Sequence, residues 1–132
     1  KIYTVDNGFV ASKAVQHFSD NGKLMENLVF TEFVKRGFEP NRELFYYKTR
    51  NGREVDFAIM NGYEISKLIQ VCYDVRNLDA EQREVKSLIE ASDELKVDNL
   101  TVLTWDDERE VKKNGKTVKF KPLWKWLLEI EK

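Results

Sequence analysis

Two carboxylates in this sequence occupy positions that call for a positive partner. Glu26 precedes Val29 and Phe30 by three and four residues, so on a helix it shares their apolar stripe at the edge of the core. Asp56 lies within an extended apolar run, although aspartate is a poor strand former. Carboxylate oxygens suit a hard cation such as Mg²⁺. The plainer alternatives are a Glu26 that reaches solvent or pairs with a lysine, and an Asp56 on a solvent-facing sheet surface.

A polar pair lies in the next extended run. Gln70 and Cys72 are two residues apart, so an unbulged strand places both side chains on one face. A glutamine and a small sulfur side chain in a buried strand are most often core residues. The pair is therefore either core packing or part of a polar site.

The elements that must position these four side chains follow from periodicity and turn residues. Apolar residues at helical spacing predict a helix from 20 or 21 to 36, which Gly37 caps. Three strands should follow as an antiparallel meander, because Arg50-Asn51-Gly52 and Asn61-Gly62 are hairpin turn sequences. These strands are predicted at 43–48, 53–60 and 65–75. In the second, alternation places Val55 on the same face as Phe57 and places Asp56 on the other.

The second half returns to a helix and then to strands. A helix is predicted for 79–95 with Asp79 as its N-cap, and a strand for 99–105. A hairpin around Asn114-Gly115 is expected within 110–120, and Pro122 starts a final helix. A short strand at 1–5 and a turn at 6–8 are predicted before the first helix. The order predicts an α/β protein of the α+β type, with a mixed central sheet flanked by helices and a C-terminal hairpin and helix.

Composition sets the class of protein. The 132 residues fit one domain, and 42% hydrophobic residues are enough for a core. Neither a 20-residue apolar run nor a signal peptide is present, which favours a cytoplasmic protein. A single cysteine excludes an internal disulfide, and the only histidine, His17, is too distant from it to suggest zinc. A net charge of −1 means that any DNA contact is local.

Seven short motifs together carry a family resemblance. They are Gly22-Lys23-Leu24-Met25-Glu26-Asn27-Leu28-Val29-Phe30, Tyr46-Tyr47, Glu54-Val55-Asp56-Phe57, Ile69-Gln70-Val71-Cys72-Tyr73, Asn77, Arg83-Glu84 and Trp124-Lys125-Trp126-Leu127-Leu128. In order and spacing they resemble the C-terminal DUF4143/DUF234-type domain of prokaryotic AAA-type ATPases, in the PD-(D/E)XK nuclease-like superfamily. The resemblance implies a restriction-endonuclease-like core and an N-terminal ATPase domain. No P-loop motif occurs in this sequence, and Lys1 opens it without a methionine, which suggests a fragment.

The resemblance also implies a set of site residues. Glu26, Asp56 and Gln70 would ligate Mg²⁺, which would polarise a DNA phosphate and help to generate hydroxide. The sequence departs from the active signature at two positions, because Gln70 stands where a second carboxylate belongs and Cys72 where a lysine belongs. An amide oxygen still ligates a hard cation with one negative charge fewer, but cysteine cannot replace an ammonium group. The site is therefore expected to be degenerate.

Other basic residues are candidates to replace the missing lysine. Lys67 is an odd number of residues from Gln70 and should point to the opposite face. Lys86 or Arg83, on the second predicted helix, is a possible substitute, although a helix lysine is most often solvated. A C-terminal lysine cluster from Lys112 to Lys125 is given low weight, as a solvated edge.

Two functions follow as expectations. One is Mg²⁺-dependent hydrolysis of DNA. The other, slightly favoured, is a module that keeps the nuclease-like fold without catalysis and contacts DNA or the ATPase domain of the same chain. Trp124 and Trp126 should divide into one core anchor and one ring that is exposed or faces the ATPase domain or another subunit.

Overall fold

The protein is described by a computed structural model over residues 21–129. Its elements follow the predicted order, and the strand and turn predicted for residues 1–8 lie outside this range. The helices and strands are α2 (Asn21–Lys35), β1 (Leu44–Lys48), β2 (Glu54–Asn61), β3 (Glu64–Cys72), α3 (Leu78–Leu95), β4 (Leu100–Thr104), β5 (Arg109–Lys113), β6 (Lys116–Pro122) and α4 (Leu123–Leu128).

The strands form one mixed sheet of six, in the order β1-β2-β3-β4-β6-β5. The predicted meander is confirmed, because β1, β2 and β3 pair antiparallel. After β3 the chain crosses over through α3, so that β4 pairs parallel with β3, and β6 pairs parallel with β4. The hairpin partner β5 completes the far edge. The carboxyl ends of β3, β4 and β6 consequently lie along one edge of the sheet.

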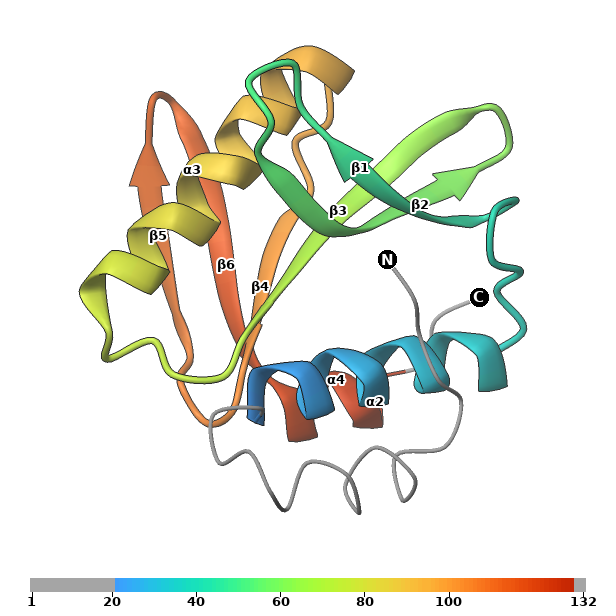
Figure 1. Ribbon diagram of the computed structural model, residues 1–132, viewed down its shortest axis with the longest axis horizontal. Helices are drawn as coiled ribbons and strands as arrows, with labels where there is room; N and C mark the ends of the chain where they lie inside the picture. The colour runs from blue at the N-terminus through green and yellow to red at the C-terminus, as the bar shows by residue number, and fades with distance from the viewer. Residues whose placement is uncertain (1–20, 130–132) are drawn as a thin grey trace.

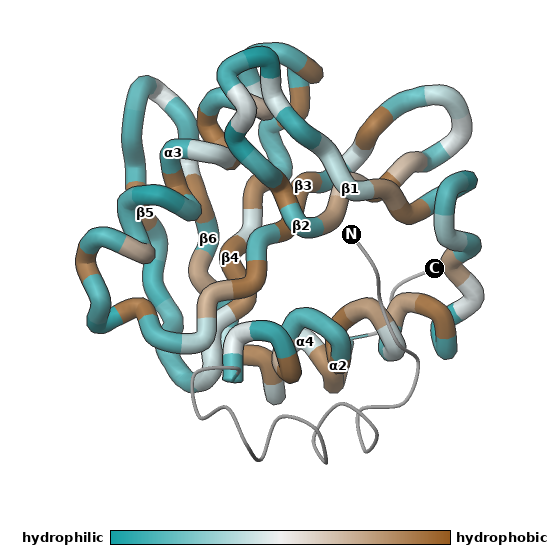
Figure 2. The backbone as a smooth tube through the Cα atoms, viewed as in Figure 1, coloured by the Kyte–Doolittle hydropathy of each residue, from teal (hydrophilic) through white to brown (hydrophobic). Residues whose placement is uncertain are grey.

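Helices cover both faces of the sheet, as the predicted fold class requires (Figure 1). One core cluster joins α2 and α4 to residues such as Phe57, Ile69 and Val71, and the other joins α3 to residues such as Leu68 and Val102. Figure 2 shows that β3 and β4, which lie between these helices, contain many residues of high hydropathy. The central strands are therefore buried on both faces, which is the usual environment of parallel strands.

Two helix ends show how local sequence sets boundaries. Gly37 has a φ of 94° beyond the end of α2, and its N–H donates to the carbonyl of Val34, which confirms the predicted cap. The N-cap of α3 is Asn77 and not Asp79. Asn77 has an extended backbone and accepts a hydrogen bond from the N–H of Ala80 at 3.2 Å. Asp79 lies in the first turn, where its charge favours the positive end of the helix dipole.

Strand ends also differ from the prediction. β3 stops at Cys72 instead of residue 75, because its parallel partner β4 ends at the opposite residue, Thr104. Pro122 is the last residue of β6 and the N-cap of α4, so the helix begins one residue later than predicted. Over residues 21–129, none of the helices is long and apolar enough to cross a membrane.

Candidate functional site at the separation of two strands

Strands β2 and β3 separate at the level of the predicted site. Their pairing runs from Asn61 opposite Glu64 to Phe57 opposite Ile69, and this is the last pair. Beyond it, β2 continues beside β1 as far as Glu54, while β3 continues beside β4 as far as Cys72. Facing backbone groups at such a separation lose their ladder partners, and buried groups of this kind need others.

The side chain of Gln70 supplies those partners. Its Oε1 accepts a hydrogen bond from the N–H of Asp56 at 2.7 Å, and its Nε2 donates to the carbonyl of Glu54 at 2.9 Å. Gln70 is only 1% exposed. We call this pair of bonds the Gln70 bridge. Of the two interpretations of Gln70, the structure places it as a core residue that joins two strands.

Asp56 completes the link in the opposite direction. Its Oδ2 accepts a hydrogen bond from the N–H of Val71 at 2.9 Å, and the residue is 9% exposed. The solvent-facing alternative for Asp56 is therefore wrong. The backbone N–H gives this buried carboxyl group a hydrogen-bond partner.

A β-bulge in β2 turns Asp56 toward the site. The side chains of β2 therefore do not alternate between the two faces as predicted. Phe45 lies opposite Ala58 and Tyr47 opposite Val55, so two residues of β2 face the single residue between them on β1. Val55 consequently packs in the α3 cluster, whereas Phe57 packs in the α2 cluster. The prediction that both share a face is wrong, because a bulge shifts the period by one residue.

Pockets open on both sides of Asp56. With Phe30 of α2 and Tyr46 of β1 it lines a pocket beneath the sheet edge. A second pocket of about 330 Å³ lies between β2 and α3, and we call it the Asp56 pocket. Its lining residues are Gly52, Arg53, Glu54, Asp56, Arg83, Glu84 and Ser87. The carboxylate is thus close to both helical layers.

Glu26 belongs to the other layer. It is half-buried on α2, one turn before Phe30, which lines the first of these pockets together with Asp56. The structure therefore joins Asp56 and Gln70 directly, whereas Glu26 lies on α2 and is not among the residues that line either pocket with Asp56. Within residues 21–129, His, Cys, Asp and Glu side chains form no group of three or more that could hold a metal ion.

Cys72 provides no charge to the site. Burial above all, together with the negative charges of Glu84 and Asp74, raises the pKa of its thiol to about 11. The thiol is therefore neutral at neutral pH. Leu68 and Cys72 pack in the α3 cluster while Ile69 and Val71 pack in the α2 cluster, so β3 alternates regularly and Gln70 lies on the Cys72 face as predicted.

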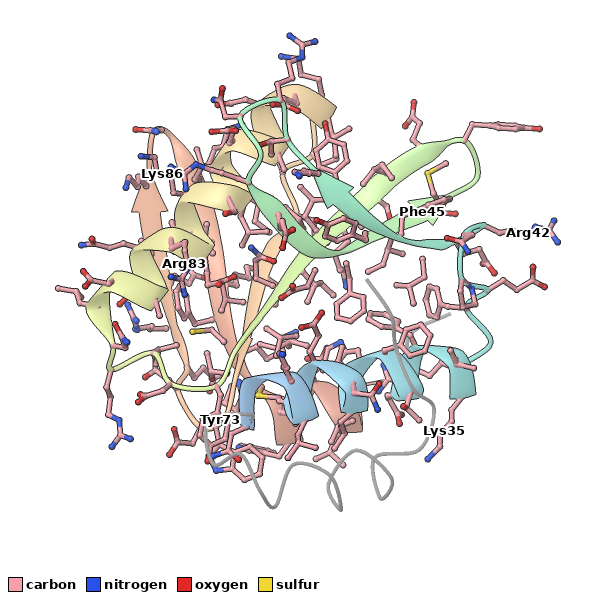
Figure 3. All side chains as sticks on the ribbon, viewed as in Figure 1. Lys35, Arg42, Phe45, Tyr73, Arg83 and Lys86 are labelled. Carbon is pink, nitrogen blue, oxygen red and sulfur yellow. The ribbon has the colours of Figure 1, made fainter. Side chains whose placement is uncertain are left out.

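The two candidate substitutes for the missing lysine lie differently. Figure 3 labels Arg83 and Lys86 on α3. Arg83 lines the Asp56 pocket and lies 4.0 Å from the Glu84 carboxylate, whereas Lys86 is exposed and is not among the lining residues. Lys67 lines a different pocket, with Phe38 and Ile59 on the α2 side, which agrees with its predicted direction.

Several lining residues of the Asp56 pocket, among them Arg53, Glu84 and Ser87, were not predicted as site residues from the sequence. Arg53 follows the β1–β2 turn and forms an ion pair with Glu90 at 3.4 Å. Glu84 and Ser87 come from α3, and the spacing of Arg83 and Ser87 by one helical turn was the available signal. That spacing alone does not indicate which part of the sheet the helix crosses.

Acidic residues neutralise much of the C-terminal lysine cluster. Each of three lysines forms an ion pair, and the pairs are Lys116 with Asp93 and Asp98, Lys121 with Glu129, and Lys125 with Glu108. Cross-strand register also places Lys119 opposite Glu110. The cluster therefore does not form a uniformly basic surface, and it gives no separate support for a nucleic-acid contact.

Comparison with known proteins assigns the chain to a family without a known activity. A family model described as a domain of unknown function, DUF4143, matches residues 21–126. An uncharacterized protein of Methanocaldococcus jannaschii, MJ1544, is 40% identical over 135 residues. The match covers 97% of this chain but only 29% of the relative, so the chain spans less than a third of that protein's length. No solved structure matches.

Proposed function

This chain belongs to the DUF4143 family, and from that membership together with the Gln70 bridge we propose that it is a PD-(D/E)XK nuclease-like domain that no longer hydrolyses DNA. It would act as a non-catalytic module of a longer ATPase. The order of Glu26 on α2, Asp56 on β2 and Gln70 on β3, and the separation of β2 from β3 beside Asp56 and Gln70, support the nuclease-like ancestry.

The Gln70 bridge is the main support for the proposed loss of catalysis. A nuclease-type metal site needs a free oxygen from β3, but the Oε1 of Gln70 already accepts the N–H of Asp56. Its Nε2 is equally engaged with the carbonyl of Glu54. Turning this amide toward a metal ion would leave the buried N–H of Asp56 and the partly buried carbonyl of Glu54 without these partners, and a fully buried group left unpaired costs about 1–3 kcal/mol.

The donor set therefore does not fit a resident Mg²⁺ ion well. Glu26, Asp56 and Gln70 would offer two carboxylates and one engaged amide oxygen, and no three acidic, Cys or His side chains of residues 21–129 are grouped around a common point. The neutral Cys72 thiol cannot stabilise a developing negative charge as an ammonium group does.

The second candidate is retained Mg²⁺-dependent cleavage. It is favoured by the pocket in which Asp56 lies with Glu84 and Arg83, because Mg²⁺ can be held by one or two carboxylates and the substrate phosphate. In this case Arg83 would be a better substitute for the missing lysine than Lys86, which does not line that pocket.

A cleavage assay separates the two candidates. The 132-residue chain is incubated with linear and branched DNA in Mg²⁺ or Mn²⁺, beside Asp56→Asn, which keeps the shape of the side chain. Asp106→Asn is the matched control, because Asp106 is an exposed aspartate outside both pockets. We expect no cleavage by any of the three proteins. Cleavage that disappears in Asp56→Asn and persists in Asp106→Asn would establish the enzyme and refute the proposal.

A further inference from the structure

An apolar groove lies at the carboxyl ends of the parallel strands, away from the Asp56 pocket. Residues from α2, from the ends of β3 and β4, and from the start of α4 line it, and these are Asn21, Leu24, Met25, Leu28, Tyr73, Trp105 and Leu123. Among the described lining residues, Asn21 is the only one with an amide or charged side chain. The groove therefore presents mainly hydrocarbon and aromatic surface.

Two aromatic rings form one wall of the groove. Tyr73 follows the last residue of β3, and Trp105 follows the last residue of β4, so the parallel pairing of these strands brings the rings together. Their centroids are 5.7 Å apart with an interplanar angle of 37°. Trp105 nevertheless remains 53% exposed, and Trp124, next in sequence to the groove residue Leu123, is 58% exposed.

Exposed large apolar side chains concentrate near this part of the molecule. The described residues include five large apolar side chains that are exposed. Of these, Trp105 directly follows β4, and Trp124 and Leu128 lie on α4. The tube in Figure 2 shows apolar segments of α2 and α4 along the same lower edge. Exposed apolar side chains beside an apolar groove are typical of an interaction site. A small-molecule site would carry several convergent polar groups, which this groove lacks.

We propose that the neighbouring domain of the longer polypeptide covers this groove. Asn21, a groove residue, is preceded by 20 further residues, so the chain leaves the described range from the groove itself. The matched part of the Methanocaldococcus jannaschii protein is 29% of its length, so most of that polypeptide lies outside this domain. A covalently attached domain has a high effective concentration at a surface beside its linker.

The inference deepens the proposed function by naming the surface through which the module contacts the rest of its chain. A docked partner would bury Trp105 and the α2 residues Leu24 and Leu28. Aromatic residues are enriched at the centres of interfaces, so the Tyr73–Trp105 pair is the expected anchor. Burial of Trp105 in the intact protein is the direct consequence.

Hydroxyl-radical footprinting of the natural full-length protein tests this inference. The measured quantity is the rate of oxidation of Trp105, with the fully exposed Tyr63 as an internal reference. Leu28→Asp places a charge in the groove, and Leu78→Asp places the same charge at an exposed leucine of α3. We expect Trp105 to be protected, Leu28→Asp to raise its oxidation several-fold, and Leu78→Asp to leave it unchanged.

Two outcomes would overturn the inference. Oxidation of Trp105 at the same rate in the unaltered protein and in Leu28→Asp would mean that nothing covers the groove. Protection that falls on dilution would mean that a second copy covers it instead. Because footprinting measures burial and not hydrolysis, either outcome leaves the non-catalytic assignment standing. Conversely, cleavage of DNA would refute the non-catalytic assignment but would not show whether the groove is covered.

Discussion

At the scale of single residues, one side chain decides how the candidate site is interpreted. Gln70 donates and accepts one hydrogen bond each with backbone groups of β2. A carboxylate can accept but cannot donate unless it is protonated. The residue type that an active metal site requires is therefore incompatible with the bridge at neutral pH.

The first prediction concerns Gln70→Glu. At neutral pH the carbonyl of Glu54 loses its donor and faces a carboxylate oxygen, so we expect the free energy of unfolding to fall by about 1–3 kcal/mol. Urea unfolding monitored by tryptophan fluorescence measures this change. Gln82→Glu, at an exposed position of α3, is the control and should unfold like the unaltered protein.

The pH dependence of the same variant follows from burial. Desolvation raises the folded-state pKa of the introduced carboxyl above its unfolded value. Its stabilising contribution is therefore complete below the unfolded pKa and is lost as pH rises through the folded pKa. The stability deficit should shrink on acidification, because the protonated carboxyl can donate to the Glu54 carbonyl. A deficit that is constant with pH would contradict this account of the bridge.

At the scale of elements, α3 holds the β1–β2 hairpin through two glutamates. Glu94 accepts a hydrogen bond from the hydroxyl of Tyr47 at 2.6 Å, and Glu90 accepts one from the hydroxyl of Thr49. The hydrogen bond from Thr49, aided by Asn51 and by the charge of Arg53, lowers the pKa of Glu90. These contacts fix one wall of the Asp56 pocket.

The second prediction concerns Glu90→Gln. Because the folded-state pKa of Glu90 is lowered, its ionised form stabilises the hairpin above the unfolded pKa, and this contribution is lost as pH falls through the folded pKa. We expect faster amide hydrogen exchange in residues 44–61 of the variant at neutral pH. The difference from the unaltered protein should vanish in acid. Glu64→Gln, at the exposed first residue of β3, should exchange like the unaltered protein at every pH.

At the scale of the whole molecule, α4 joins the last strand to the core beneath the sheet. Trp126 is 1% exposed and contacts Phe33 with ring centroids 5.1 Å apart. The guanidinium group of Arg36 lies over its indole ring and donates to the carbonyls of Trp126 and Leu127. The division of the two tryptophans into a core anchor and an exposed ring is therefore confirmed.

The third prediction compares the two tryptophans. Trp126→Ala should lower the free energy of unfolding by about 3–5 kcal/mol, because it removes a large buried ring and leaves a cavity. Trp124→Ala should change it by less than about 0.5 kcal/mol. Urea unfolding monitored by circular dichroism measures both. Equal losses in the two variants would contradict the packing of α4.

Much of this architecture could be predicted from local sequence. Turn residues such as Asn51-Gly52 and Asn61-Gly62 fix the meander, and the cap at Gly37 depends only on neighbouring residues. The bulge at Asp56 could not be predicted, because it depends on which residues of the neighbouring strand β1 lie opposite β2. Asn77 and Asp79 are both good N-caps, so the sequence did not decide between them.

The candidate site was predictable to a similar extent. Asp56 and Gln70 were singled out from the sequence, but their direct link requires the separation of β2 from β3, which periodicity does not reveal. Glu84 joins Asp56 in one pocket only because α3 crosses beside the hairpin. Contacts between elements distant in sequence depend on this crossing and not on local propensity.

The Gln70 bridge has an evolutionary consequence. If the ancestor of this domain carried an acid at position 70, its replacement by glutamine exchanged a carboxylate that can bind a metal ion for an amide that bonds the backbone of β2. A reversion by mutation would then pass through a less stable chain before any enzymatic benefit arose. The direction of change is thus asymmetric, and lineages that acquired the amide would tend to keep it.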